Sequence, residues 1–162
     1  MSLLTVQLGE EHAKLMPHVD ELRIVADYAP EIPESSLRSR VRREYEFLVQ
    51  EVLPHMDAEQ ETLHPVMERL LSDRHPRLPL AHSHAEIRGL VDALGALSEP
   101  GGVVGTAWQL ETRRALYQLF ALLKIHLAEE EMFTPILEAE LSEAEDVELA
   151  AKLEFGAPPT AR

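Results

Sequence analysis

The chain has 162 residues, 45% of them hydrophobic, and its 29 acidic and 15 basic side chains give a formal net charge of −14. This length is sufficient for one globular domain with a buried core, and we expect a single domain over 1–162. The negative charge disfavours nucleic acid and anionic membrane surfaces as partners, because both would repel it. With no cysteine in the chain, disulfides and thiolate ligands are excluded, so any bound metal must accept nitrogen and oxygen ligands.

Apolar side chains recur at helical spacing in four stretches of the chain, and each stretch predicts an amphipathic helix. The four expected helices cover roughly 8–29, 35–71, 80–97 and 106–141. Their mostly short connections favour an all-α fold, an antiparallel up-down-up-down four-helix bundle over about 8–141. The connection at 72–79, which contains His75, shows no periodicity and is expected to be an exposed loop.

Serines and prolines set the expected ends and distortions of these helices. Ser35 or Ser36 is expected to cap the second helix, and Ser142 with Glu145 has the pattern of a capping box. That box predicts a short C-terminal extra helix over about 142–155, followed by a frayed tail. Prolines inside the expected helices should kink them, and these are Pro54, Pro65 and Pro135. A break of the second helix at Pro54 is the alternative to one continuous helix.

Two histidine–glutamate pairs with the spacing H-x-x-x-E occur in the second and fourth expected helices. They are His55–Glu59 and His126–Glu130. One helical turn separates the members of each pair, so both side chains project from the same face. Two unrelated surface pairs are the simpler explanation, but the repetition of the spacing inside apolar frames favours a shared function.

A further histidine precedes each pair at almost the same distance. His12 and His84 both begin the frame H-A-x-x-x-x-x-V-D-x-L, which indicates an internal duplication of the pattern H…HxxxE. His18 competes with His12 on the first helix, but in the duplication His12 aligns with His84 while His18 aligns with Leu90. The duplication therefore selects one histidine from each of the four helices.

Four inward-facing imidazoles and two carboxylates would be costly to bury without partners, and a metal centre removes that cost. Imidazole and carboxylate without thiolate suit iron, manganese or zinc. Six ligands are too many for one tetrahedral zinc but match two ions, with each glutamate bridging and two histidines capping each ion. The expected metal ligands are His12, His55, Glu59, His84, His126 and Glu130.

This arrangement resembles the hemerythrin-like, or HHE cation-binding, family, whose pattern is H…HxxxE…H…HxxxE on an antiparallel four-helix bundle. The strings HMDAEQETLHP and HLAEEEMFTP also resemble the family's H…EE..lfP segment. The resemblance covers about 8–141 and implies a non-haem di-iron centre, oxo- or hydroxo-bridged, with manganese or zinc as alternatives. It implies a protein that binds, senses or reacts with a small oxidant: oxygen, peroxide or nitric oxide. The alternatives are a catalase- or peroxidase-like di-iron enzyme and an iron storage or sensing protein.

The sequence departs from the oxygen carriers of this family at one position. Those proteins have a fifth histidine, as an H-x-x-x-H pair on the third helix, whereas Leu80 and Arg88 stand four residues on either side of His84. One iron is therefore expected to be more open, which weakly favours reaction with peroxide or sensing over reversible oxygen binding.

Other histidines and glutamates also have metal-ligand spacings. His82–Glu86 is a third H-x-x-x-E pair, but it points away from His84 around the helix and is expected on the surface. Glu61–His64 forms an E-x-x-H motif of the ferritin-like di-iron proteins, and we interpret it as a coincidence because that class needs two such motifs. Glu131 remains an alternative to Glu130 as the bridging carboxylate.

The N-terminal residues have neither a basic region nor a cleavage site typical of an export signal, and no apolar run is long enough to span a membrane. A cytoplasmic location is therefore expected. The sequence leaves the oligomeric state open.

Overall fold

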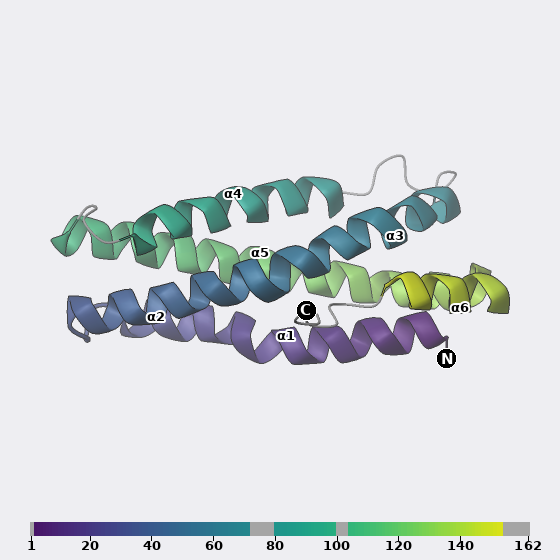
Figure 1. The fold of residues 1–162 in the computed structure, drawn as a ribbon, viewed down its shortest axis with the longest axis horizontal. Coiled ribbons are helices and arrows are strands. Elements are labelled where there is room, and N and C mark those ends of the chain that lie inside the picture. The colour runs from purple at the N-terminus through teal and green to yellow at the C-terminus, as the bar shows by residue number, and fades with distance from the viewer. Residues whose placement is uncertain (1, 72–79, 100–103, 154–162) are drawn as a thin grey trace, which may run out of the picture.

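The computed structural model describes residues 2–71, 80–99 and 104–153, and these form an all-helical bundle without strands. The elements are α1 (Leu3–Tyr28), α2 (Glu34–Phe47), the π-helix η1 (Leu48–Val52), α3 (Leu53–Leu71), α4 (Leu80–Ser98), α5 (Gly105–Glu140) and α6 (Glu143–Lys152). The long helices run alternately in opposite directions, with α2, η1 and α3 forming one arm, and α6 lies at the end of the bundle near the N-terminus (Figure 1). The expected four-helix bundle with a C-terminal extra helix is confirmed.

Two expected segments, the 72–79 connection with His75 and the C-terminal tail, lie outside the described residues. None of the described helices combines the length and the apolar character that a membrane span requires.

Helix α1 begins at Leu3, earlier than the expected start near residue 8, because two caps stabilise its first turn. The Ser2 side chain accepts a hydrogen bond from the backbone N–H of Thr5. The carboxylate of Asp146, on α6, accepts from the backbone N–H groups of Leu3 and Leu4 at 2.8 and 3.1 Å. A distant carboxylate at a helix N-terminus satisfies exposed donors and favours the helix dipole. The sequence around residue 3 gives no sign of it.

The expected serine cap of the second helix is wrong. Helix α2 begins at Glu34, with Pro33 at the N-cap position and no side-chain cap. The carboxylate of Glu34 instead accepts from Arg38 one turn later and from the backbone N–H of Gly105, at the start of α5. The contact with Gly105 satisfies a backbone donor at the start of α5 and ties the two helix starts together. In contrast, the capping box of Ser142 and Glu145 is present at the start of α6.

The second arm of the bundle is continuous, and the alternative of a break at Pro54 is not observed. Helix α2 passes into η1 (Leu48–Val52), and α3 follows directly. Pro54 donates no backbone hydrogen bond, and its ring crowds the carbonyl four residues earlier, so the wider π-helical turn absorbs the missing bond. Because a π-helical segment changes the register of the following residues, it helps set the direction in which His55 and Glu59 point.

The apolar core consists of two clusters along the bundle. The larger one contains Leu22, Leu48, Trp108 and Leu119, and the smaller one, beside α6, contains Leu4, Leu63, Leu137 and Leu153. On α1 the change from one cluster to the other falls between Leu8 and Leu15. On α3 it falls between Met56 and Leu63, and on α5 between Leu127 and Leu137. Each of these three intervals contains residues that the duplication selects, so a polar layer separates the two clusters.

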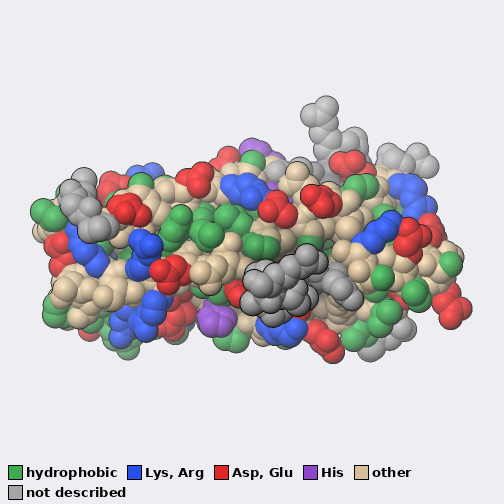
Figure 2. Space-filling view, viewed as in Figure 1, with side chains coloured by type: hydrophobic (Ala, Val, Ile, Leu, Met, Phe, Trp, Pro, Cys, Tyr) green, Lys and Arg blue, Asp and Glu red, His purple; other side chains and the backbone are tan. Residues whose placement is uncertain are grey.

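Charged side chains of both signs are interspersed over the face of the molecule in Figure 2.

Glu44 on α2 is an acidic residue that is buried, with only 7% of it exposed. Burial, together with the like charge of Glu21, raises the pKa of Glu44 to about 7, although Arg43 and Arg40 oppose the shift. The folded chain therefore holds a proton on Glu44 more tightly than the unfolded chain does.

This difference predicts a pH-dependent effect of Glu44→Gln. The contribution of Glu44 to the stability of the wild type should fall as the pH rises from about 4.5 to about 7, because the folded pKa of Glu44 lies above the unfolded one. The glutamine variant lacks this loss. We expect it to be more stable than the wild type by about 1–2 kcal/mol at pH 8, after allowance for solvent screening, and nearly equal at pH 4. Urea unfolding at both pH values measures the difference.

Glu111→Gln, at an exposed position of α5, is the matched control and should show the same small effect at both pH values. An equal effect of Glu44→Gln at pH 4 and pH 8 would show that the pKa of Glu44 is not raised in the folded chain.

Candidate metal centre

The structure brings together all six residues that the duplication selects. Each is between 0 and 4% exposed, and they come from four helices. The set is His12 of α1, His55 and Glu59 of α3, His84 of α4, and His126 and Glu130 of α5. Antiparallel packing places these positions at one level of the bundle, in the polar layer between the apolar clusters.

Donor atoms from four of these residues form a first compact group, made by His12, His55, Glu59 and Glu130, in which the atoms all lie within 4.8 Å of one another. The Nε2 atom of His55 lies 2.9 Å from Oε1 of Glu59. The Nε2 atom of His12 lies 3.7 Å from the same oxygen and 3.4 Å from Oε2 of Glu130. Two imidazoles and two carboxylates therefore converge on one point.

A second group consists of Glu59, His84, His126 and Glu130, with the same maximum separation. The Nε2 atoms of His84 and His126 lie 3.0 Å apart. They lie 3.9 and 3.8 Å from Oε2 of Glu59, and Nε2 of His126 lies 3.3 Å from Oε1 of Glu130. Each carboxylate thus turns one oxygen toward the first group and the other oxygen toward the second.

The two carboxylates differ in their pKa values. Burial alone would raise the pKa of Glu59, but the surrounding imidazoles of His12, His126 and His55 outweigh it and hold the pKa well below its usual value. Burial raises the pKa of Glu130, and the like charge of Glu59 adds to the shift although His12 opposes it. Glu59 is therefore the more firmly ionised of the two.

The imidazoles of the site also differ in their pKa values. Burial would lower the pKa of His12, but Glu130 and Glu59 prevail and raise it to about 9. The pKa of His126 is also raised, because the same carboxylates outweigh its burial. Burial and the neighbouring imidazoles lower the pKa of His84 to about 3. A proton on His12 thus balances part of the charge of the buried carboxylates, and a metal ion would take over that role and release the proton.

Several buried nitrogen and oxygen atoms of the site lie near one another as ion pairs but make no hydrogen bond among the described residues. They include both ring nitrogens of His12 and all four carboxylate oxygens of Glu59 and Glu130. Such atoms are expensive to bury, and a cation that accepts nitrogen and oxygen ligands would satisfy them. The donor set of imidazoles and carboxylates fits iron, manganese or zinc. The residues present therefore fit the metal centre that the sequence predicted.

Polar side chains outside the two groups orient two of the imidazoles. The Nδ1 atom of His126 lies 3.1 Å from the hydroxyl oxygen of Ser83, and Nδ1 of His84 lies 3.4 Å from Oε1 of Gln60. A hydrogen bond at Nδ1 fixes the ring and leaves Nε2 for a metal. Both contacts aim Nε2 at the polar layer. Sequence reasoning missed Ser83 and Gln60, because neither belongs to a motif.

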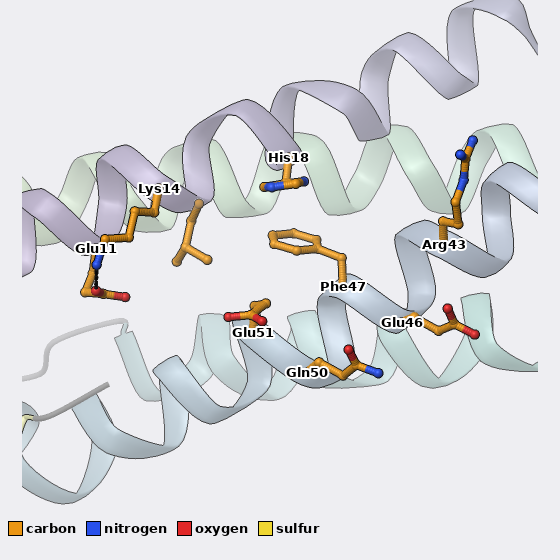
Figure 3. A pocket seen from close by; sticks show the side chains of 9 residues that line it. Glu11, Lys14, His18, Arg43, Glu46, Phe47, Gln50 and Glu51 are labelled. Carbon is orange, nitrogen blue, oxygen red and sulfur yellow. Dashed lines mark hydrogen bonds and ion pairs between the residues drawn. The ribbon is translucent and has the colours of Figure 1, made fainter. Parts of the chain in front are cut away.

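The alternative ligands are placed apart from the two groups. His18 is exposed, and its ring stacks on Phe47 with centroids 4.6 Å apart, in the groove between α1 and α2 that Figure 3 shows. The side chain of Glu131 is 59% exposed, and its Oε1 lies 3.8 Å from Nδ1 of His12, on the outer edge of that ring. Position and burial thus favour His12 over His18, and Glu130 over Glu131.

The remaining pairs give one expected and one unexpected result. The side chains of His82 and Glu86 are 79% and 58% exposed, so this pair lies on the surface as expected. Glu61 is exposed, but His64 is buried, and its ring centroid lies 4.7 Å from that of His84. The E-x-x-H spacing therefore does not place both side chains in the site, but the ring of His64 adjoins that of His84. Its place in the apolar stripe, directly after Leu63, is the signal that could have revealed it.

One family model matches the chain, that of the hemerythrin HHE cation-binding domain, over residues 4–132. The matched segment contains all six selected residues and ends before α6. Searches of curated proteins and of solved structures gave no match. The family match covers most of the chain and agrees with the helical bundle and its buried histidine–glutamate layer. The chain belongs to the hemerythrin HHE cation-binding domain family.

Proposed function

We propose that the polar layer binds two metal ions bridged by Glu59 and Glu130. The observation that carries this proposal is that each carboxylate belongs to both four-residue groups and faces them with different oxygens. A single ion would occupy one group and leave the imidazoles of the other group without a metal ion. Two ions would give each group two histidines and a share of both carboxylates.

We further propose that both ions are iron and that the centre binds, senses or reacts with a small oxidant. Nitrogen and oxygen donors without thiolate suit iron, and the chain belongs to a cation-binding family. When bound, a pair of irons supplies one-electron chemistry and a position for oxygen, peroxide or nitric oxide. The residues of the chain hold the ions, and the apolar clusters on both sides of the layer restrict the access of water.

Metal analysis tests the two-ion proposal. Protein reconstituted anaerobically with ferrous iron should retain two irons per chain after desalting. Glu59→Gln should lower this number below one, because the residue belongs to both groups. His82→Gln, at an exposed position, is the control and should retain two. One iron per wild-type chain would contradict the bridged pair, and none would exclude an iron centre.

Optical spectra test the proposed reaction with an oxidant. When oxygen or hydrogen peroxide is added to the ferrous protein, we expect near-ultraviolet absorption of bridged ferric iron. Catalytic consumption of peroxide would support the peroxide-decomposing alternative, whereas a reversible change with oxygen would support binding or sensing. An iron-loaded protein that gives no spectral change with oxygen, peroxide or nitric oxide would contradict this part of the proposal.

The choice between adjacent glutamates is tested with matched variants. Glu130→Gln should weaken iron binding by more than about a hundredfold, because the buried carboxylate faces both groups. Glu131→Gln should weaken it by less than about tenfold, because this exposed side chain reaches only the outer nitrogen of His12. Competition with a chelator measures both affinities. The reverse order would identify Glu131 as the bridge.

A further inference from the structure

The most unusual buried group outside the six residues is the imidazole of His64 on α3. Only 6% of the residue is exposed, and its Nε2 atom is buried without a hydrogen-bond partner among the described residues. We propose that His64 is an additional metal ligand, which donates through Nε2 to the ion held by His84 and His126. This inference rests on the proposed metal centre.

The position of the His64 ring indicates which of the two ions it would coordinate. Its centroid lies 4.7 Å from that of His84, with the ring planes tilted by 36°. The His84 ring in turn lies 4.6 Å from that of His126. The three imidazoles therefore form a row that leads from α3 through α4 to α5. The other two imidazoles, His12 and His55, form a separate pair with centroids 5.4 Å apart.

The described neighbours of His64 on α3 do not explain why its ring nitrogen is buried. Its neighbours on the buried face of α3, Leu63 and Met67, belong to the smaller apolar cluster and offer no hydrogen bond to a ring nitrogen. A polar atom buried without a partner costs free energy unless a ligand satisfies it. An imidazole nitrogen is a common metal ligand, so a bound ion would give Nε2 of His64 the partner that it lacks among the described residues.

Coordination requires the ring of His64 to move. Nε2 of His64 is not among the donor atoms of the two compact groups, so the ring must turn toward the ion. No hydrogen bond among the described residues holds Nε2 in its present direction. Helix α4 offers no competing donor one turn after His84, because Arg88 stands there and pairs with Asp57. Arg88 therefore does not compete with His64 for a coordination position on this ion.

The extra ligand would make the two ions unequal. The ion between His84 and His126 would have three imidazoles, and the ion between His12 and His55 would have two. Since both share the same carboxylates, the ion with fewer imidazoles would keep more open positions. The small oxidant would then bind on the side of His12 and His55.

Cobalt(II) tests the inference without an oxidant. The measurement is proton NMR of the cobalt-loaded wild type. Each histidine that coordinates through Nε2 gives one strongly shifted, exchangeable Nδ1–H signal in the spectrum. We expect five such signals. In His64→Gln and His64→Leu one signal should be lost, and one of the two cobalt ions should bind at least about tenfold more weakly. His82→Gln, at an exposed position, should retain five signals and both affinities.

Four signals in the wild type, unchanged in His64→Gln, would overturn the inference and leave His64 as a packing partner of His84. The wild-type count alone decides the question if both His64 variants fail to fold, which circular dichroism would reveal. A wild type that binds no cobalt, iron, manganese or zinc would instead overturn the proposed metal centre. The two failures are therefore distinguishable.

Discussion

The structure depends on the burial of two carboxylates among imidazoles in the middle of a helical bundle. Glu59 and Glu130 are 0 and 3% exposed, and their oxygens have no hydrogen-bond partner among the described residues. A buried carboxylate without compensation is among the most expensive groups that a core can contain. A proton on His12 compensates part of this cost in the metal-free chain, and bound cations would compensate it more completely. The polar layer therefore lowers the stability of the metal-free fold, which indicates that it is present for a function.

The rest of the bundle holds this layer in place. Apolar clusters pack on both of its sides, and each of the helices α1, α3 and α5 contributes to both clusters. The π-helical segment η1 lies just before the first histidine–glutamate pair and sets the register of α3. Helix α6, which lies beyond the family match, packs against α1 and caps its first turn through Asp146. These contacts stabilise the end of the bundle that carries the smaller cluster.

The apolar periodicity together with the duplicated pattern H…HxxxE was sufficient to predict the bundle and the six residues that the structure brings together. It succeeded because helical periodicity links spacing to a common face, and because two copies reduce the chance of coincidence. It failed where tertiary contacts decide. A carboxylate far along the chain caps the start of α1, and the carboxylate of Glu34 accepts from the backbone N–H of Gly105 at the start of α5. The burial of His64 beside His84 was not predicted, because it depends on the packing of α3 against α4.

The central claim is that two ions lie between the shared carboxylates. Anomalous diffraction at the iron edge, from crystals of the iron-loaded protein, tests it most directly. The account predicts two peaks about 3.5–4 Å apart, one between His12 and His55 and the other between His84 and His126, with Glu59 and Glu130 in contact with both. A single peak, or peaks at the protein surface away from Glu59 and Glu130, would contradict it.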